Sequence, residues 1–368
     1  MTAQLTLGVG LDGYGWHPHA WRTTLAAEPN TASALSGRYW AELAATAERG
    51  LLDFLTIDDT LMPQNGPREQ ISPRRLAGRA DAVLVGARIA PATRHIGLIP
   101  VATVTHTEPF HVSKAIATLD FVSHGRAGWQ PRVSSTVHEA ALFGRRNATE
   151  SAEDLFDEAT DFVEVVRRLW DSWEDDAVIR DVSTGRFVDR DKLHYIDFVG
   201  KYFSVKGPSI TPRSPQGQPV VAALAHAARI YEFAAAGADV VFITPTDDAA
   251  VRTIIDEVRH AGGEHLKIYA DVVVACGGDI DGFVSDAVIF TDGAPALVDL
   301  LLRWQELGVD GARLRPAVNF TDLPVIVDEV VPLLQRAGVF RTEYRAGETL
   351  RERLHLSASP NRYVRVGR

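Results

Sequence analysis

Residues 101–130, VATVTHTEPFHVSKAIATLDFVSHGRAGWQ, contain a strand end, a helix, a tight turn and the next strand with almost no linker. Proline is typical of a first helical turn, so Pro109, with the hydroxyl of Thr107 just before it, predicts a helix start. Gly125 is typical of a helix end, and Arg126 begins the next strand. The stretch therefore predicts a βαβ crossover, the unit from which parallel sheets are built.

The same alternation of short apolar runs with longer amphipathic runs extends along nearly the whole chain. We expect eight strands, at 5–11, 54–58, 96–101, 127–133, 220–224, 240–244, 268–275 and 311–315. Helices fit between them at 37–50, 73–88, 109–123, 152–173, 227–237, 247–262, 295–308 and 323–338. Eight such units predict an α/β protein with the TIM (β/α)8 barrel fold, and a doubly wound open sheet is the structural alternative.

One long insertion, 175–217, separates the fourth helix from the fifth strand. Within it, 195–199 and 202–205 flank Gly200 and Lys201, which predicts a β-hairpin. We expect this hairpin to lie over one end of the barrel, with Tyr202 as a substrate contact; a solvent-exposed flap or a dimer contact is the alternative. We treat 1–368 as a single domain with a C-terminal tail at 339–368.

The composition favours a soluble protein with a small ligand. The net charge is −10 and the basic residues are scattered, which opposes binding to nucleic acid. No apolar stretch approaches the ~20 residues of a membrane span, and the N-terminus does not resemble a signal peptide, so we expect no membrane and a cytoplasmic location. Cys276 is the only cysteine, which excludes an intrachain disulfide and a cysteine metal cluster.

In a TIM barrel, functional groups come from the C-terminal ends of the strands and the loops that follow. The loop after the first strand, 13–22, is rich in aromatic and basic residues, and the third strand ends close to a histidine. The candidates are catalytic His17 and His106 and, for substrate contact, Trp16, His19, Trp21 and Arg22. His106 has a purely structural role as its alternative.

Three strings carry a resemblance to a known family: TEPFH at 107–111, ATLDFVSHGRAGWQ at 117–130 and WDSWEDDA at 170–177. The sequence resembles the branch of the bacterial-luciferase-like flavin monooxygenases that contains nitrilotriacetate monooxygenase component A and dibenzothiophene-sulfone monooxygenase. The resemblance implies a TIM barrel in a single domain, and a homodimer is usual in that family. It also implies a two-component reaction, in which a separate flavin reductase supplies reduced FMN. Oxygen then forms a flavin C4a-(hydro)peroxide that passes one oxygen atom to a small organic substrate.

A flavin ring needs a flat apolar slot and hydrogen-bond partners along its pyrimidine edge. Asp59, Thr103 and Gln130 stand at strand ends where they could supply such partners. Asp59 matches a flavin-contacting acid of the family, and Gln130 takes the place of its asparagine; a helix cap is the alternative for Asp59. Ala225 and His226 stand where the family holds the FMN phosphate with hydroxyls, so the helix N-terminus and His226 are the expected phosphate ligands.

The residues leave three other functions open. The close rival is an oxidoreductase that uses the deazaflavin F420. The spacing of His17 and His19 also occurs in metal-dependent hydrolases on this barrel, but the later strands offer only His226 as a further ligand, so we expect no metal. Ala152 and Phe156 replace a histidine and a tyrosine of the family, which leaves a flavin-poor ligand-binding homologue as the third alternative.

Overall fold

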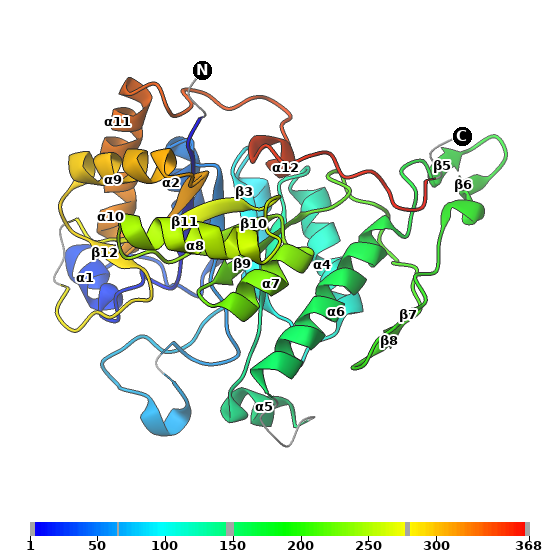
Figure 1. The fold of residues 1–368 in the computed structure, drawn as a ribbon, viewed down its shortest axis with the longest axis horizontal. Coiled ribbons are helices and arrows are strands. Elements are labelled where there is room, and N and C mark those ends of the chain that lie inside the picture. The colour runs from blue at the N-terminus through cyan, green and yellow to red at the C-terminus, as the bar shows by residue number, and fades with distance from the viewer. Residues whose placement is uncertain (1–3, 65, 145–150, 277–279, 365–368) are drawn as a thin grey trace.

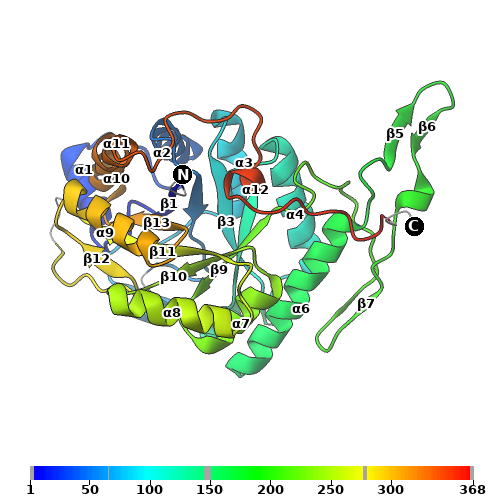
Figure 2. The ribbon, with the colours of Figure 1, turned by 45° about the horizontal axis from the view of Figure 1, so that its top comes forward.

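The computed structural model describes residues 4–64, 66–144, 151–276 and 280–364. Its centre is a barrel of eight parallel strands surrounded by helices (Figures 1 and 2). Around the ring the strands are β10 (Val240–Ile243), β9 (Val220–Ala225), β4 (Gly128–Arg132), β3 (Gly97–Thr103), β2 (Phe54–Ile57), β1 (Thr6–Leu11), β13 (Gly311–Pro316) and β11 (Lys267–Val274). Pairing of β10 with β11 closes the ring, so the TIM barrel prediction is confirmed and the open sheet is wrong.

The helices lie outside the ring. They are α1 (Ala20–Ala27), α2 (Gly37–Arg49), α3 (Ala82–Ile89), α4 (Pro109–Val122), α5 (Val137–Phe143), α6 (Ala152–Asp171), α7 (Ala228–Gly237), α8 (Asp248–His260), α9 (Ala294–Glu306), α10 (Asn319–Val325), α11 (Val331–Arg336) and α12 (Leu350–Arg353). A π-helical turn, Ile326–Val330, joins α10 to α11. A short strand, β12 (Val288–Phe290), pairs in parallel with the C-terminal part of β11. Within the described part of the chain, no helix has both the length and the apolarity needed to cross a membrane.

The predicted start of α4 at Pro109 is confirmed, but one other helix start and the predicted role of Thr107 were wrong. The helix expected at 73–88 begins only at Ala82, because the Asp81 side chain accepts from the Leu84 N–H and caps it there. The preceding residues form a loop instead. Thr107 does not cap α4: its hydroxyl donates back to the Thr103 carbonyl at 2.8 Å, and Glu108 is the residue that precedes the helix.

The insertion forms two hairpins that project from the side of the barrel (Figure 2). One pairs β5 (Val178–Asp181) with β6 (Arg186–Val188). The other pairs β7 (Phe198–Val199) with β8 (Ser204–Val205), so the predicted hairpin exists but is shorter than expected. Phe198 and Phe203 pack against Val165 and Leu169 of α6. The second hairpin therefore lies along the outer side of α6.

The lower half of the barrel interior is apolar. Alternate residues of the strands point inward and form a cluster with the short C-terminal helix: Phe54, Ile99, Val220, Ala222, Val240, Phe242, Tyr269, Leu350 and Leu354. Gly8 is required in this layer, because a Cβ added there would lie 2.1 Å from the Phe54 ring. Leu350 and Leu354 come from the C-terminal tail, which thereby closes the bottom of the barrel.

Candidate active site

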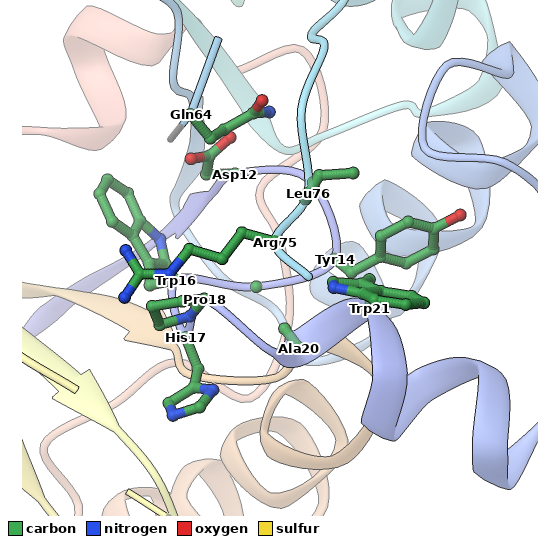
Figure 3. Close-up of a pocket in the computed structure, with 11 residues that line it drawn as sticks. Asp12, Tyr14, Trp16, His17, Pro18, Ala20, Trp21, Gln64, Arg75 and Leu76 are labelled. Carbon is green, nitrogen blue, oxygen red and sulfur yellow. The ribbon is translucent and has the colours of Figure 1, made fainter. Parts of the chain in front are cut away.

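A first cavity of about 110 Å³ opens at the C-terminal end of β1 (Figure 3). Its aromatic wall consists of Tyr14, Trp16 and Trp21, which all come from the segment after β1. Gln64 and Arg75, from the loop after β2, complete it. The cavity is therefore built from the loops after β1 and β2 and the start of α1, at the barrel mouth, where ligands of this fold bind.

Hydrogen bonds fix the two tryptophans of this cavity. The Trp16 indole donates to the Gly10 carbonyl at 2.7 Å, and the Arg315 guanidinium lies 4.6 Å from the centre of its ring. Trp21, on α1, donates to the Arg74 carbonyl at 3.2 Å. Both rings can thus serve as rigid apolar walls. Trp16, His17 and Trp21, three of the predicted site residues, line this cavity together.

His17 lines the first cavity and is held by its own loop, whereas the other predicted residues of this region do not line it. The His17 Nδ1 accepts from the His19 N–H at 3.1 Å, and the His17 ring packs 5.1 Å from Phe283. Figure 3 shows this ring pointing away from Asp12. His19 precedes α1, and Arg22 is exposed on it; neither lines the cavity. His106 is buried with a φ of 72° and stacks on Phe143 of α5, which favours a structural role.

A second cavity, of about 320 Å³, opens at the ends of β4 and β9. Its apolar wall is made of side chains from β9, α6 and α7: Leu224, Leu155, Phe156, Ile230 and Phe233. Gln130, Arg132 and Asp58 provide its polar side. Phe156 and Ala152, which replace polar residues of the family, both line it, so the replacement makes this cavity more apolar.

The N-terminus of α7 lies at the rim of the second cavity. Its capping residue is Ala227, which has no side chain that could accept from the first N–H groups. His226 lines the cavity and is exposed, whereas Ala225 is buried at the end of β9. The Ile230 N–H donates to the Ala227 carbonyl at 2.9 Å, so the N–H groups of Ala228 and Arg229 are the ones left for an anion, with His226 as an adjacent donor.

An ion-paired cluster separates the two cavities. Arg79 donates to Asp12, which lines the first cavity, at 3.2 Å, and to Asp58, which lines the second, at 3.0 Å. Arg132 also lies 3.6 Å from Asp58. Burial raises the pKa of Asp12 to about 7, since it outweighs the opposing charge of Arg79. Asp12 therefore changes charge near neutral pH at the boundary of both cavities.

Below the cavities, the upper half of the barrel interior is charged. Asp271 of β11 is completely buried and accepts from Arg313 at 2.7 and 2.5 Å and from Arg315. Arg313 also donates to Gln130 Oε1 at 2.8 Å, and Arg315 to Asp286 at 2.7 Å. Two buried cations thus share one buried carboxylate directly under the mouth. Within the described residues, no group of three or more histidine, cysteine, aspartate or glutamate side chains is placed to bind a metal ion.

Three further predicted site residues lie away from both cavities. The Asp59 carboxylate accepts from the N–H groups of Thr60 and Ala82 at 2.7 and 2.9 Å, and burial raises its pKa to about 6. Thr103 is buried at the end of β3. Tyr202 donates to Asp154 of α6 at 3.1 Å, on the outer side of that helix. The predicted cover over the barrel mouth is therefore wrong: side-chain packing on α6 holds the hairpin beside the mouth.

Sequence reasoning missed the charged residues that organise this site. Asp12 follows β1 directly, so the strand-end rule that selected its neighbours also applies to it. Asp271 lies in the middle of an otherwise apolar strand, and Arg313 and Arg315 alternate on another. A charge at an inward position of a buried strand is the signal that could have revealed them.

The fold and the mouth define a class: a TIM-barrel protein whose ligands bind at the C-terminal ends of its strands. Residues 19–315 match a family model described as "Luciferase-like monooxygenase". N-acetyl-S-(2-succino)cysteine monooxygenase of Bacillus subtilis (strain 168) is 32% identical over 445 aligned positions, which cover 98% of this chain and 99% of the relative. Nitrilotriacetate monooxygenase component A of Aminobacter aminovorans is 29% identical, with 97% and 98% covered.

Solved structures agree on the fold. The crystal structure of a long-chain alkane monooxygenase superposes with a TM-score of 0.83 at 24% identity and covers 96% of both chains. The chain belongs to the luciferase-like monooxygenase family and is a flavin-dependent monooxygenase, an oxidoreductase. The resemblance expected from the three sequence strings is thereby confirmed, down to the branch.

Proposed function

We propose that the protein is the oxygenase of a two-component system. It would take reduced FMN from a separate flavin reductase and, with O2, transfer one oxygen atom to a small organic substrate. The family supports this proposal, as does a relative that is named component A of a nitrilotriacetate monooxygenase. The string GVGLDG at 8–13 matches GxGxxG, but Gly8 and Gly10 lie within β1 and not in a turn between a strand and a helix, so it does not favour a nicotinamide site.

The residues of the second cavity fit a flavin mononucleotide. Its volume of about 320 Å³ lies within the range typical of small-molecule sites. Leu224, Phe156 and Phe233 offer a flat apolar wall for the ring, and Gln130 offers a polar group at its edge. The open N-terminus of α7, with His226, offers donors for the phosphate. Asp59 and Thr103 would act indirectly, by holding the strand ends in place.

The first cavity would hold the substrate. When bound, a reduced flavin supplies the electrons that activate O2 for transfer to the substrate. Trp16 and Trp21 would orient the substrate and exclude water, which protects reactive species from hydrolysis. Asp12, whose pKa is raised to about 7, would exchange a proton with the first cavity, which it lines. His17 would act by supporting the loop after β1.

The observation that carries the proposal is the arrangement of two cavities with one shared ion-paired wall. Anaerobic calorimetry with FMN and riboflavin, each oxidised and reduced, tests the flavin site. We expect reduced FMN to bind, and His226→Ala to weaken FMN binding about tenfold while leaving riboflavin unchanged, since only FMN carries the anion. Ala225→Ser combined with Ala227→Ser should tighten FMN selectively.

Two results would contradict the proposal. Failure of every flavin to bind would contradict the flavin site. Reduction of FMN by NADH or NADPH with this protein alone would contradict the need for a separate reductase.

The expected homodimer is part of the same proposal, and the exposed apolar side chains Val182 and Val199 of the insertion support it. Sedimentation of the protein tests the dimer.

A further inference from the structure

A third cavity, of about 420 Å³, lies outside the barrel between α1, α2 and α10. Helix α10 packs against both other helices (Figure 2). The apolar side of this cavity consists of Leu43, Phe320, Leu323 and Pro324. None of its lining residues also lines the first or the second cavity, so it is separate from the sites proposed for flavin and substrate.

Asn319 presents one unused acceptor in the lining of the third cavity. This residue begins α10 and is 1% exposed. Its Nδ2 donates to the Gly13 carbonyl at 3.0 Å and to the Tyr39 hydroxyl at 3.3 Å. A carbonyl can only accept, so the amide nitrogen must face Gly13 and the amide oxygen must face away from it. Among the described residues, this buried oxygen has no hydrogen-bond partner.

Thr24 of α1 has an unused hydroxyl in the same lining. It is also 1% exposed, and its Oγ1 has no hydrogen-bond partner in the described part of the chain. A helical threonine commonly donates to the carbonyl one turn earlier, and this bond is not made here. Buried polar groups without partners are costly, so the cavity favours a ligand that brings an N–H or O–H donor to these two oxygens.

The charges of the lining favour a cation. The charged lining residues are Glu28, Arg38 and Glu42, and Arg38 lies 3.6 Å from Glu42. Two carboxylates against one guanidinium leave one excess negative charge. Helix α1 ends at Ala27 without a basic residue in its last turn, so the negative end of its dipole adds to this charge. The excess is exposed to water, which makes its effect modest.

We propose that the third cavity is an effector site for a small apolar amine in its protonated form. The ammonium group donates to Asn319 Oδ1 and Thr24 Oγ1. Glu28 lies one turn after Thr24, as its N–H donates to the Thr24 carbonyl at 2.8 Å, and it compensates the charge of the ligand. The apolar part of the ligand packs on Leu323 and Phe320.

The residues around the third cavity also hold a wall of the first cavity. Tyr14 forms that wall (Figure 3), and its ring lies 5.3 Å from the Tyr39 ring. The Asn319 N–H donates to the Tyr14 carbonyl at 2.8 Å, and the Ala34 N–H donates to the Tyr14 hydroxyl at 3.3 Å. Tyr39 donates to the Gly13 carbonyl at 2.9 Å. An amine that holds Asn319 therefore also restrains Tyr14.

Three probes with the same phenyl ring and two-carbon chain test the chemistry of the ligand. They are 2-phenylethylamine, 2-phenylethanol and 3-phenylpropanoate, which are cationic, neutral and anionic near neutral pH. Calorimetry should show that the amine binds several-fold more tightly than the alcohol, because its donor is charged, and that the carboxylate binds most weakly. Equal binding of the amine and the carboxylate would overturn the proposal.

Two variants test the polar contacts. Thr24→Val should melt at or above the wild-type temperature, because the replaced hydroxyl makes no hydrogen bond, yet it should bind the amine about three- to tenfold more weakly. Glu28→Gln should reduce the preference for the amine over the alcohol. Glu264→Gln, an exposed position in the loop after α8, is the matched control and should bind all three probes as the wild type does.

A third variant tests the place of binding. Ala32→Trp puts a large ring into the lining of the third cavity, and it should abolish amine binding. Its melting temperature should stay near that of the wild type, since Ala32 lies in a loop. Wild-type affinity for the amine in both Ala32→Trp and Thr24→Val would show that the amine binds elsewhere, and would overturn the proposal.

Hydrogen exchange tests the link between the cavities. The N–H groups of Ala34 and Asn319, which both donate to Tyr14, should exchange more slowly when the amine is bound. The same amine should leave these rates unchanged in Ala32→Trp. Unchanged exchange at both N–H groups in the amine-saturated wild type would overturn the role of the cavity as an effector site.

Discussion

The lower and upper halves of the barrel interior are built from the same strands but differ in chemistry. In the lower half, Phe54 and Tyr269 pack on Leu350 of the C-terminal tail. Two residues further along the strands, Asp271 and Arg313 form a buried ion pair. Inward positions of a strand recur every second residue, so a single step along β11 changes the layer from an aromatic core to a charged cluster. The bottom stabilises the barrel, and the top serves the site.

The two halves also differ in how they tolerate change. The apolar layer is closely packed, so the cost of a substitution there depends on how much it changes the volume of the side chain. A buried charge depends on its partner, because the partner offsets the loss of hydration. Substitutions in the upper half should therefore have larger and less local effects than substitutions of similar size in the lower half.

The largest effect is expected at Asp271. Asp271→Ala leaves both Arg313 and Arg315 without their shared carboxylate, which should cost about 3–5 kcal/mol of unfolding free energy. Denaturation in urea measures the loss. A cost below about 1 kcal/mol would mean that the two arginines find other partners, and that the halves do not differ as described.

A smaller effect is expected at Gly8, in the lower half. Gly8→Ala places a methyl group 2.1 Å from the Phe54 ring, which should cost about 1–3 kcal/mol through overpacking. Phe54→Leu removes the colliding part of the ring. The double variant should then cost less than the sum of the single ones, and strict additivity in a double-mutant cycle would contradict a packing explanation.

The smallest effect concerns pH. The pKa of Asp12 is raised to about 7 in the folded protein, mainly by burial, so the folded state holds a proton that the unfolded state has released above pH ~4. Its contribution to stability is therefore largest at low pH and falls as the pH rises towards 7. Asp12→Asn should remove this fall, and gain on the order of 1–2 kcal/mol relative to the wild type between pH 5 and pH 8.

Asp328→Asn is the control for the pH experiment. Asp328 is an exposed carboxylate whose pKa is lowered by a hydrogen bond from Arg49, so its contribution is lost as the pH falls and does not change above neutral pH. Urea denaturation of both variants and the wild type at the two pH values provides the comparison. A parallel gain in Asp328→Asn would show that net charge, rather than burial of Asp12, causes the effect.

The sequence predicted what local patterns determine. Apolar runs of strand length predicted all eight barrel strands. The rule that functional residues follow the C-terminal ends of the strands predicted that Trp16 and Trp21 lie at the mouth. Contacts between distant segments were not predictable in this way. Arg79 stands in a stretch that was expected to be helical, and it joins Asp12 and Asp58 only because the loop after β2 turns back over the barrel.

The predicted hairpin illustrates the same limit. Its turn is set by neighbouring residues, and the structure contains it. Its place is set by packing on α6 and by the bond from Tyr202 to Asp154, a residue 48 positions earlier. No local pattern distinguishes a hairpin over the mouth from one beside it.

The C-terminal tail has a consequence for how the protein is made. Leu350 and Leu354 complete the bottom of the barrel, and the Leu350 N–H donates to the Gly125 carbonyl at 2.9 Å. A ribosome that adds about 5–20 residues per second has already released every strand when it reaches this helix. Until then, Phe54 can pack on Phe242 and Tyr269 but not on Leu350 or Leu354. The barrel floor is therefore completed only after all eight strands have been made.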